Sequence, residues 1–195
     1  MAMALARRPW LLAALAGLLS TQAPTQAQAQ AAASAPAAGP PPPPELADAL
    51  PGARWRGAGV MRFLGLHIYD ARLWSPEPVG SDSSGQALAL ELVYARKLVG
   101  RLIAERSLKE MQGVGPVSDA QGTQWLQAML RLFPDVQAGD RLTGIQRPGQ
   151  SARFFFNGKL RGEVADADFT RLFFGIWLSP RTSEPQLRAQ LLGQT

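Results

Sequence analysis

The sequence predicts an α+β fold in which an antiparallel β-sheet is covered by helices on one face. The first observation is that the expected strands cluster, three between residues 57 and 97 and three between residues 140 and 164. The second is that helical spacing of apolar residues follows each cluster, over residues 98–133 and 169–192. Strands that cluster rather than alternate with helices favour antiparallel pairing, with the helices gathered on one face of the sheet.

The first cluster opens with a hairpin over residues 57–74, which read GAGVMRFLGLHIYDARLW. Gly65 lies where a hairpin turn is expected, with apolar runs on both sides. If Leu64 and Gly65 form a two-residue loop, Phe63 pairs with Leu66. Cross-strand partners then project to the same face of the sheet.

Polar side chains of this hairpin form a candidate binding surface. In the expected register Arg62 pairs with His67 and Val60 with Tyr69, so these four residues and Arg56 share one face. A cation and a phenol on an apolar floor can hold an oxyanion or a carboxylate. The surface depends on the register, because a slip of one residue would separate its members. The alternative is that Arg62 is a surface charge and Tyr69 an ordinary core residue.

The rest of the first half continues this pattern. Residues 86–97 alternate as a third strand. Residues 98–111 take helical spacing, and a second helix over residues 118–133 opens at a capping box formed by Ser118 and Gln121. The first of these helices carries apolar residues on one side, namely Leu98, Leu102, Ile103 and Met111.

Residues 140–164 are expected to form a three-stranded meander with turns at Pro148-Gly149 and Asn157-Gly158. Asn-Gly between apolar runs is the strongest short-range signal for a hairpin. Asp166 and Asp168 are expected to cap the next helix rather than to serve as an acid–base pair.

Two helices are expected to close the chain. The first carries a broad apolar stripe of Phe169, Leu172, Phe173, Ile176 and Trp177. A last short helix is expected to be capped by residues Ser183 to Gln186, with Pro185 in its first turn.

The N-terminal residues 1–29 have the features of a secretory signal peptide. Arg7 and Arg8 precede a ten-residue apolar core, and Ala27-Gln28-Ala29 offers a cleavage site. We therefore expect the mature protein to begin near Gln30 and to be periplasmic. Residues 30–45 are rich in alanine and proline and predict an extended linker, so residues 46–195 are expected to form a single domain.

Composition excludes several classes of function. The chain has no cysteine, which rules out disulfides, thiol catalysis and thiolate metal sites, and His67 is its only histidine. Loss of Arg7 and Arg8 on cleavage lowers the net charge from +5 to +3, with 18 basic and 15 acidic residues. The basic residues are scattered, so nucleic-acid binding is not expected. After the signal segment, no apolar run is long enough to predict a membrane span. No phosphate- or dinucleotide-binding motif opens a helix, so we expect no cofactor.

Several of these segments, taken in order, resemble the chalcone isomerase-like family, and its exported bacterial branch in particular. The matching pieces are GAGVMRFLGLHIYDARLW, LELVYARK, FPDVQAGDRL, RFFFNGKLRGEV, FTRLFFGIWLSP and LRAQLLG, which together span about residues 50–193. The resemblance implies an open-faced β-sandwich, with a ligand cleft between a large antiparallel sheet and the helices.

The resemblance also implies which positions matter for chemistry. In the plant enzymes of the family an arginine holds a phenolate while a threonine and a tyrosine polarise a ketone. The arginine matches Arg62, whereas the places of the threonine and the tyrosine are held here by Leu64 and Val99. Non-catalytic relatives bind fatty acids in the same cleft. If this chain acts as they do, the resemblance implies that Arg62 and Tyr69, with His67 nearby, would bind the carboxylate.

Three functions remain open at this point. The first is a periplasmic, non-catalytic binder of a fatty acid or similar amphipathic carboxylate. The second is a chalcone isomerase-type isomerase, an intramolecular lyase, with an unknown substrate and Arg62 as electrostatic stabiliser. The third is a scaffold protein whose cleft is filled by its own side chains. The sequence does not define the ligand or the oligomeric state.

Overall fold

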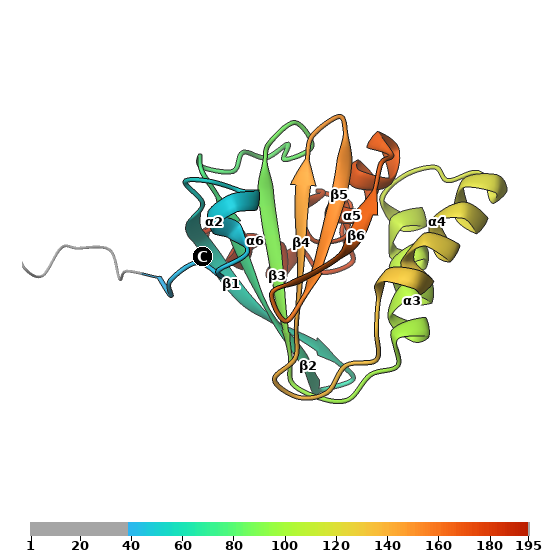
Figure 1. Cartoon of the computed structure of the whole chain (residues 1–195), viewed down its shortest axis with the longest axis horizontal. Helices are drawn as coiled ribbons and strands as arrows, with labels where there is room; N and C mark the ends of the chain where they lie inside the picture. Colours follow the sequence, from blue (N-terminus) through green and yellow to red (C-terminus); the bar gives the residue numbers. More distant parts are fainter. Residues whose placement is uncertain (1–38, 195) are drawn as a thin grey trace, which may run out of the picture. The chain divides into compact units, whose positions relative to one another are not determined.

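The computed structural model describes residues 39–194, so the expected signal peptide and most of the expected linker lie outside the described residues. Six antiparallel strands form one sheet in the order β1-β2-β3-β4-β5-β6, each hydrogen-bonded to its neighbours in the chain (Figure 1). The strands are β1 (Arg54–Phe63), β2 (Leu66–Ser75), β3 (Leu88–Tyr94), β4 (Arg141–Arg147), β5 (Ser151–Phe156) and β6 (Lys159–Val164). This arrangement confirms the predicted α+β fold.

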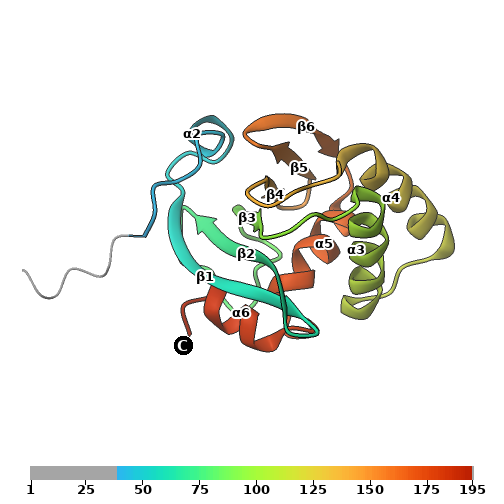
Figure 2. The ribbon, with the colours of Figure 1, turned by 90° about the horizontal axis from the view of Figure 1, so that it is seen from below.

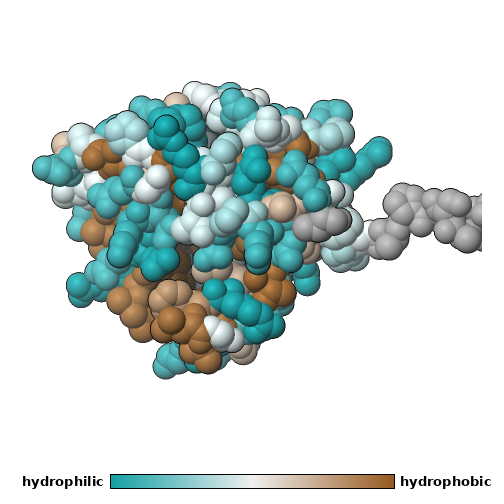
Figure 3. Space-filling model, turned by 180° about the vertical axis from the view of Figure 1, so that it is seen from behind, coloured by the Kyte–Doolittle hydropathy of each residue, from teal (hydrophilic) through white to brown (hydrophobic). Residues whose placement is uncertain are grey.

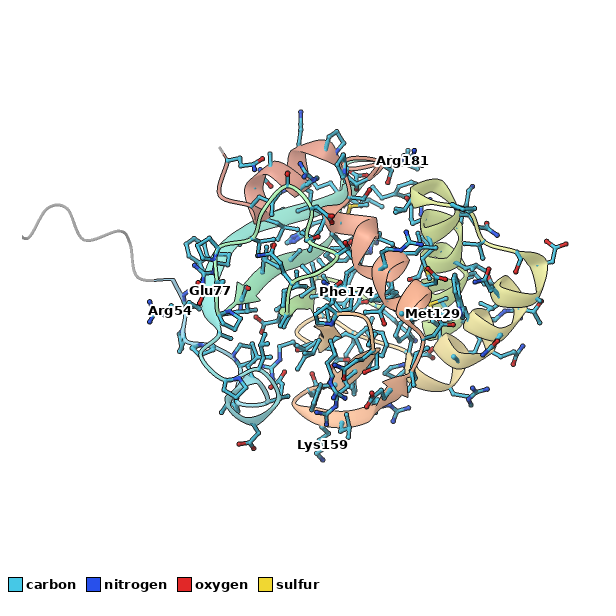
Figure 4. All side chains as sticks on the ribbon, turned by 90° about the horizontal axis from the view of Figure 1, so that it is seen from above. Arg54, Glu77, Met129, Lys159, Phe174 and Arg181 are labelled. Carbon is cyan, nitrogen blue, oxygen red and sulfur yellow. The ribbon has the colours of Figure 1, made fainter. Side chains whose placement is uncertain are left out.

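Four helices cover one face of the sheet, as the sequence predicts. They are α3 (Gly100–Val114), α4 (Asp119–Leu132), α5 (Ala167–Leu178) and α6 (Pro185–Leu191). Helix α5 lies against the sheet between α6 and the α3–α4 pair (Figure 2). Its whole apolar stripe is buried, and the aromatic rings of Phe154, Phe169 and Phe173 pack together beneath it. Phe174 of α5 and Met129 of α4 point into this interior (Figure 4).

Local sequence signals account for the starts of α4 and α5. Ser118 and Gln121 form the predicted capping box of α4. The Asp166 carboxylate accepts a hydrogen bond from the backbone N–H of Phe169 and so caps α5 as predicted. The predicted cap at Ser183 is wrong, because α6 begins after Glu184 and the Ser183 hydroxyl donates to Glu110 instead.

Helix α6 packs directly on strand β1, and two glycines make the contact possible. A Cβ atom at Gly57 would lie only 2.3 Å from the Gln190 backbone oxygen, and one at Gly59 would lie equally close to the Gln190 side chain. The Gly57-Ala58-Gly59 sequence therefore serves close packing of a helix on a strand.

The opposite face of the sheet carries one short helix, α2 (Leu46–Ala49), which contributes to a second, smaller core. The residue before it, Glu45, is almost fully buried. Its carboxylate accepts hydrogen bonds from Thr143 at 2.7 Å and from Arg141 at 2.9 Å. The sequence predicts Glu45 to be the last residue of the linker, whereas in the structure it is buried within the folded unit.

None of the helices in the described part of the chain has the length and apolarity needed to cross a bilayer. Residues 39–194 also contain no cluster of three or more histidine, aspartate or glutamate side chains that could hold a metal ion.

Candidate functional site

A cavity of about 280 Å³ lies between the sheet and the helices. Strand residues form one wall: Met61, Phe63, Ile68, Tyr69, Leu92, Tyr94 and Leu142. Helical residues form the facing wall: Leu102 and Ile103 of α3, and Phe173, Ile176 and Trp177 of α5. These walls are almost wholly apolar. Such a space, with a few polar groups at one place, is the usual form of a small-molecule site.

Tyr69 of β2 supplies one of those polar groups. Its hydroxyl oxygen accepts a hydrogen bond of 3.0 Å from Nε1 of Trp177, and its ring packs edge-on against Tyr94. Because the oxygen is the acceptor in that bond, the hydroxyl proton is available for donation to another group. Burial raises the pKa of Tyr69 above its ordinary value, so the phenol stays neutral and remains a donor at physiological pH.

Helix α3 supplies two of the three charged groups that line the cavity, and the third is Glu184, directly before α6. Arg106 and Glu110 form an ion pair of 2.6 Å, and the Ser183 hydroxyl donates to the second Glu110 oxygen at 2.7 Å. The Arg106 guanidinium also lies 5.6 Å from the centre of the Phe63 ring, a cation–π contact. Only one terminal nitrogen of Arg106 is engaged by Glu110, which leaves further N–H groups of this side chain for a ligand.

Helical periodicity explains why α3 presents these residues together. Ile103, Arg106, Ser107 and Glu110 follow at intervals of three, one and three residues, which places them on one helical face. The helix is anchored at its start, where the backbone N–H of Gly100 donates to Asp135 at 2.8 Å. The polar groups are therefore carried by a fixed element rather than by a loop.

The β1–β2 hairpin departs from the predicted register after its second pair. Phe63 pairs with Leu66 and Arg62 with His67 as predicted, but Tyr69 pairs with Met61 rather than with Val60. A β-bulge causes the difference. Between these two pairs, β2 contains one residue, Ile68, that has no partner in β1.

The bulge separates Tyr69 from Arg62 and His67, the other two residues predicted for the site. Tyr69 lines the cavity, as do Met61 and Phe63 on the neighbouring strand. Arg62 lies between those two residues in β1, is exposed, and is not part of the cavity lining. His67 is not part of it either and bonds instead to Asp70 at 3.0 Å.

Sequence reasoning missed Arg106. The available signal was its position in the apolar stripe of the predicted helix, four residues after Leu102 and three after Ile103. An arginine in such a stripe is expected either to reach solvent or to serve a buried polar site. Arg106 does both, because its side chain lines the cavity and remains partly exposed.

Comparison with known proteins agrees with this architecture. The family model described as chalcone isomerase-like matches residues 54–193, which is more than half of the chain. The chain belongs to the chalcone isomerase-like family. An uncharacterized protein of Haemophilus influenzae is 30% identical over 149 residues, which cover 75% of this chain and 72% of the relative.

A solved structure shows the same fold. A fatty-acid binding protein of Arabidopsis thaliana superposes with a TM-score of 0.59 at 14% sequence identity. The match covers 72% of this chain and 87% of the plant protein. At this identity the likeness concerns the fold alone, so the chemistry of the cavity has to be argued from its own residues.

Proposed function

We propose that this chalcone isomerase-like protein is exported to the periplasm and binds a fatty acid, or a similar amphipathic carboxylate, without transforming it. The observation that carries the proposal is the cavity between sheet and helices, which joins long apolar walls to a guanidinium and an oriented hydroxyl. The fatty-acid binding protein that shares the fold adds support for the ligand class. The signal-peptide pattern of residues 1–29 supports export.

The head group of the ligand would be held by Arg106 and Tyr69. A guanidinium such as that of Arg106 can bind a carboxylate through two parallel N–H groups. Arg106, Glu110 and Glu184 line the same cavity as Tyr69. The ligand would compete with Glu110 for the guanidinium, which favours reversible binding over very tight binding.

The apolar part of the ligand would lie between the strand wall and α5. Burial of apolar surface contributes about 25 cal/mol per Å², so the acyl chain rather than the head group would supply most of the affinity. We therefore expect affinity to increase with chain length until the cavity is filled.

An isomerase of the chalcone isomerase type, an intramolecular lyase, remains the alternative. Leu64 and Val99, which match the places of the ketone-polarising groups, are both exposed and neither lines the cavity. Since loss of one such donor typically lowers a rate about 10²–10³-fold, we expect a trihydroxychalcone to cyclise no faster than in buffer. Turnover like that of a dedicated enzyme would contradict a binding role.

Calorimetric titration with dodecanoate tests the proposal. We expect Arg106→Ala to weaken binding about 10–100-fold, the range for losing a hydrogen bond to a charged group. Arg62→Ala is the matched control, because it removes the same side chain from a neighbouring position outside the cavity lining. Equal affinity in wild type and Arg106→Ala, or an equal loss in Arg62→Ala, would contradict the assignment of the head-group site.

A further inference from the structure

Apolar side chains gather at one end of the molecule, next to the cavity. In Figure 3 they form a continuous patch at the lower end, where Figure 1 places the tip of the β1–β2 hairpin. Leu64 at the tip is 85% exposed, and Phe63 and Leu66 beside it are 48% and 52% exposed. Leu102 of α3 is 59% exposed. We call these four residues the apolar rim.

The rim is continuous with the cavity. Phe63 and Leu102 each line the cavity and are also about half exposed, so they belong to both surfaces. Arg106 lies over the Phe63 ring and links the hairpin tip to α3. A hydrophobic ligand that leaves the cavity past these residues would meet the rim first.

The backbone at the tip is unfavourable for the residue it carries. Leu64 has a φ of 49°, in the left-handed region that leucine rarely adopts. Its side chain is almost fully exposed, so burial within this chain does not compensate for that cost. Conformational strain combined with an exposed large apolar side chain marks a position at which a different residue would make the turn more stable.

Basic residues predominate beside the rim. Residues 62–69 and 95–102, which include the four rim residues, contain Arg62, Arg96, Lys97 and Arg101 and no acidic residue, and the nearest acids along the chain, Asp70 and Glu105, are paired with His67 and Arg101. A backbone hydrogen bond from Ala95 to Ile68 joins the two segments. Within residues 39–194, three of these cations take part in no ion pair, the exception being Arg101 with Glu105.

We propose that the apolar rim docks on an anionic lipid bilayer, with Leu64 inserted among the acyl chains and the flanking cations at the head groups. Apolar side chains at a hairpin tip, bordered by lysine and arginine, have the chemistry that interfacial membrane binding requires. In this position the open side of the cavity would face the membrane. A fatty acid could then pass between bilayer and cavity with little exposure to water. The rim and its charges do not depend on which ligand the cavity holds.

Vesicle co-sedimentation tests this proposal with protein purified after export. The probes are vesicles of phosphatidylcholine alone and of phosphatidylcholine mixed with phosphatidylglycerol. We expect binding to the mixed vesicles, weaker binding to the neutral ones, and weakening by salt. Leu64→Asn should lower the affinity for mixed vesicles about tenfold or more, because a leucine side chain no longer inserts.

Leu160→Asn is the matched control. Leu160 is 54% exposed, follows the turn of another hairpin, and is flanked by Lys159 and Arg161. All variants share the same N-terminal residues, so a difference between them belongs to the substituted side chain. Failure of the wild type to bind mixed vesicles, or an equal loss in Leu64→Asn and Leu160→Asn, would overturn the proposal.

Two further measurements separate the outcomes. Dodecanoate titration of Leu64→Asn should match the wild type, since Leu64 does not line the cavity. Loss of vesicle binding in Leu64→Asn would therefore support docking even in a protein that bound no dodecanoate. Analytical ultracentrifugation tests self-association: a dimer that Leu64→Asn converts to a monomer, without vesicle binding, would assign the rim to a second copy and overturn membrane docking.

Discussion

Two hairpins of this sheet have turns of the same backbone conformation, but the residues in the two turns differ. Leu64 and Gly65 connect β1 to β2 with φ values of 49° and 78°. Asn157 and Gly158 connect β5 to β6 with φ values of 49° and 82°. Both are therefore two-residue loops with two left-handed positions, the geometry for which Asn-Gly is the preferred sequence.

The surroundings of the two tips differ as much as their residues. The Asn157 side chain accepts a hydrogen bond from the Arg141 backbone N–H at 2.8 Å and donates one to Asp140 at 2.9 Å. The Leu64 side chain is 85% exposed. One tip is built into the sheet by local contacts, while the other presents a large apolar group to its surroundings.

The comparison indicates what each hairpin contributes. The β5–β6 hairpin has the preferred residues in its turn and serves the stability of the fold, although its register also shifts once, between Phe154 and Phe155. The β1–β2 hairpin gives up local stability at its tip, contains a bulge, and supplies Tyr69 and Phe63 to the cavity. A hairpin that breaks local rules next to a cavity is where functional constraints are expected.

The largest effect is expected for Asn157→Leu, which makes the second turn resemble the first. The variant loses two side-chain hydrogen bonds and places a leucine in the left-handed region. We expect the free energy of unfolding to fall by about 2–4 kcal/mol. Urea unfolding measures this, and dodecanoate affinity measured on the folded variant should be unchanged. A loss below 0.5 kcal/mol, roughly the limit for neutral surface changes, would contradict the claim that Asn157 stabilises its turn.

A somewhat smaller effect is expected for Tyr69→Phe. The substitution leaves the Trp177 indole N–H without its acceptor, which costs about 1–3 kcal/mol of stability. Dodecanoate binding should also weaken, because the cavity loses its hydroxyl donor. Unchanged stability together with unchanged affinity would remove Tyr69 from the site.

The raised pKa of Tyr69 also predicts how the free energy of unfolding depends on pH. Burial raises the pKa of Tyr69 above its ordinary value of 10.0, so the folded protein holds the proton more tightly than the unfolded chain. The stability linked to this group is thus fully present below about pH 10 and is lost as the pH rises further. Urea unfolding at a series of pH values should show a decline above pH 10 that is shallower in Tyr69→Phe. Tyr94, whose pKa burial also raises, should account for part of the remaining slope.

The smallest effect is expected for Leu64→Asn, which gives the first turn the sequence of the second. Asparagine tolerates the left-handed region better than leucine does, so we expect stability to increase by about 1 kcal/mol. The measurement is again urea unfolding, with Leu160→Asn as the exposed control. A loss of stability would show that Leu64 makes a contribution to folding that its exposure does not reveal.

Most of the fold could be predicted from the sequence because its signals are local. The two-residue turns, the Ser118 capping box and the Asp166 cap each depend on a few neighbouring residues. Glu45 could not be assigned correctly in this way. Its partners Arg141 and Thr143 lie 96 and 98 residues further along the chain, and only the folded sheet brings them together.

The site was less accessible to sequence reasoning. Tyr69 was identified, and the structure places it in the cavity lining. The register that joined it to Arg62 failed because a bulge adds one residue to β2, and no glycine or proline in that strand marks the place. Arg106 was missed because its role depends on how α3 lies over the hairpin, which helical periodicity alone does not define.

The most direct test of the central claim is a crystal structure of the protein with dodecanoate. We expect the carboxylate within hydrogen-bond distance of the Arg106 guanidinium and the Tyr69 hydroxyl, with the acyl chain between the sheet and α5. A carboxylate held by Arg62 and His67 outside the cavity, or a cavity that stays unoccupied at saturating dodecanoate, would contradict the account.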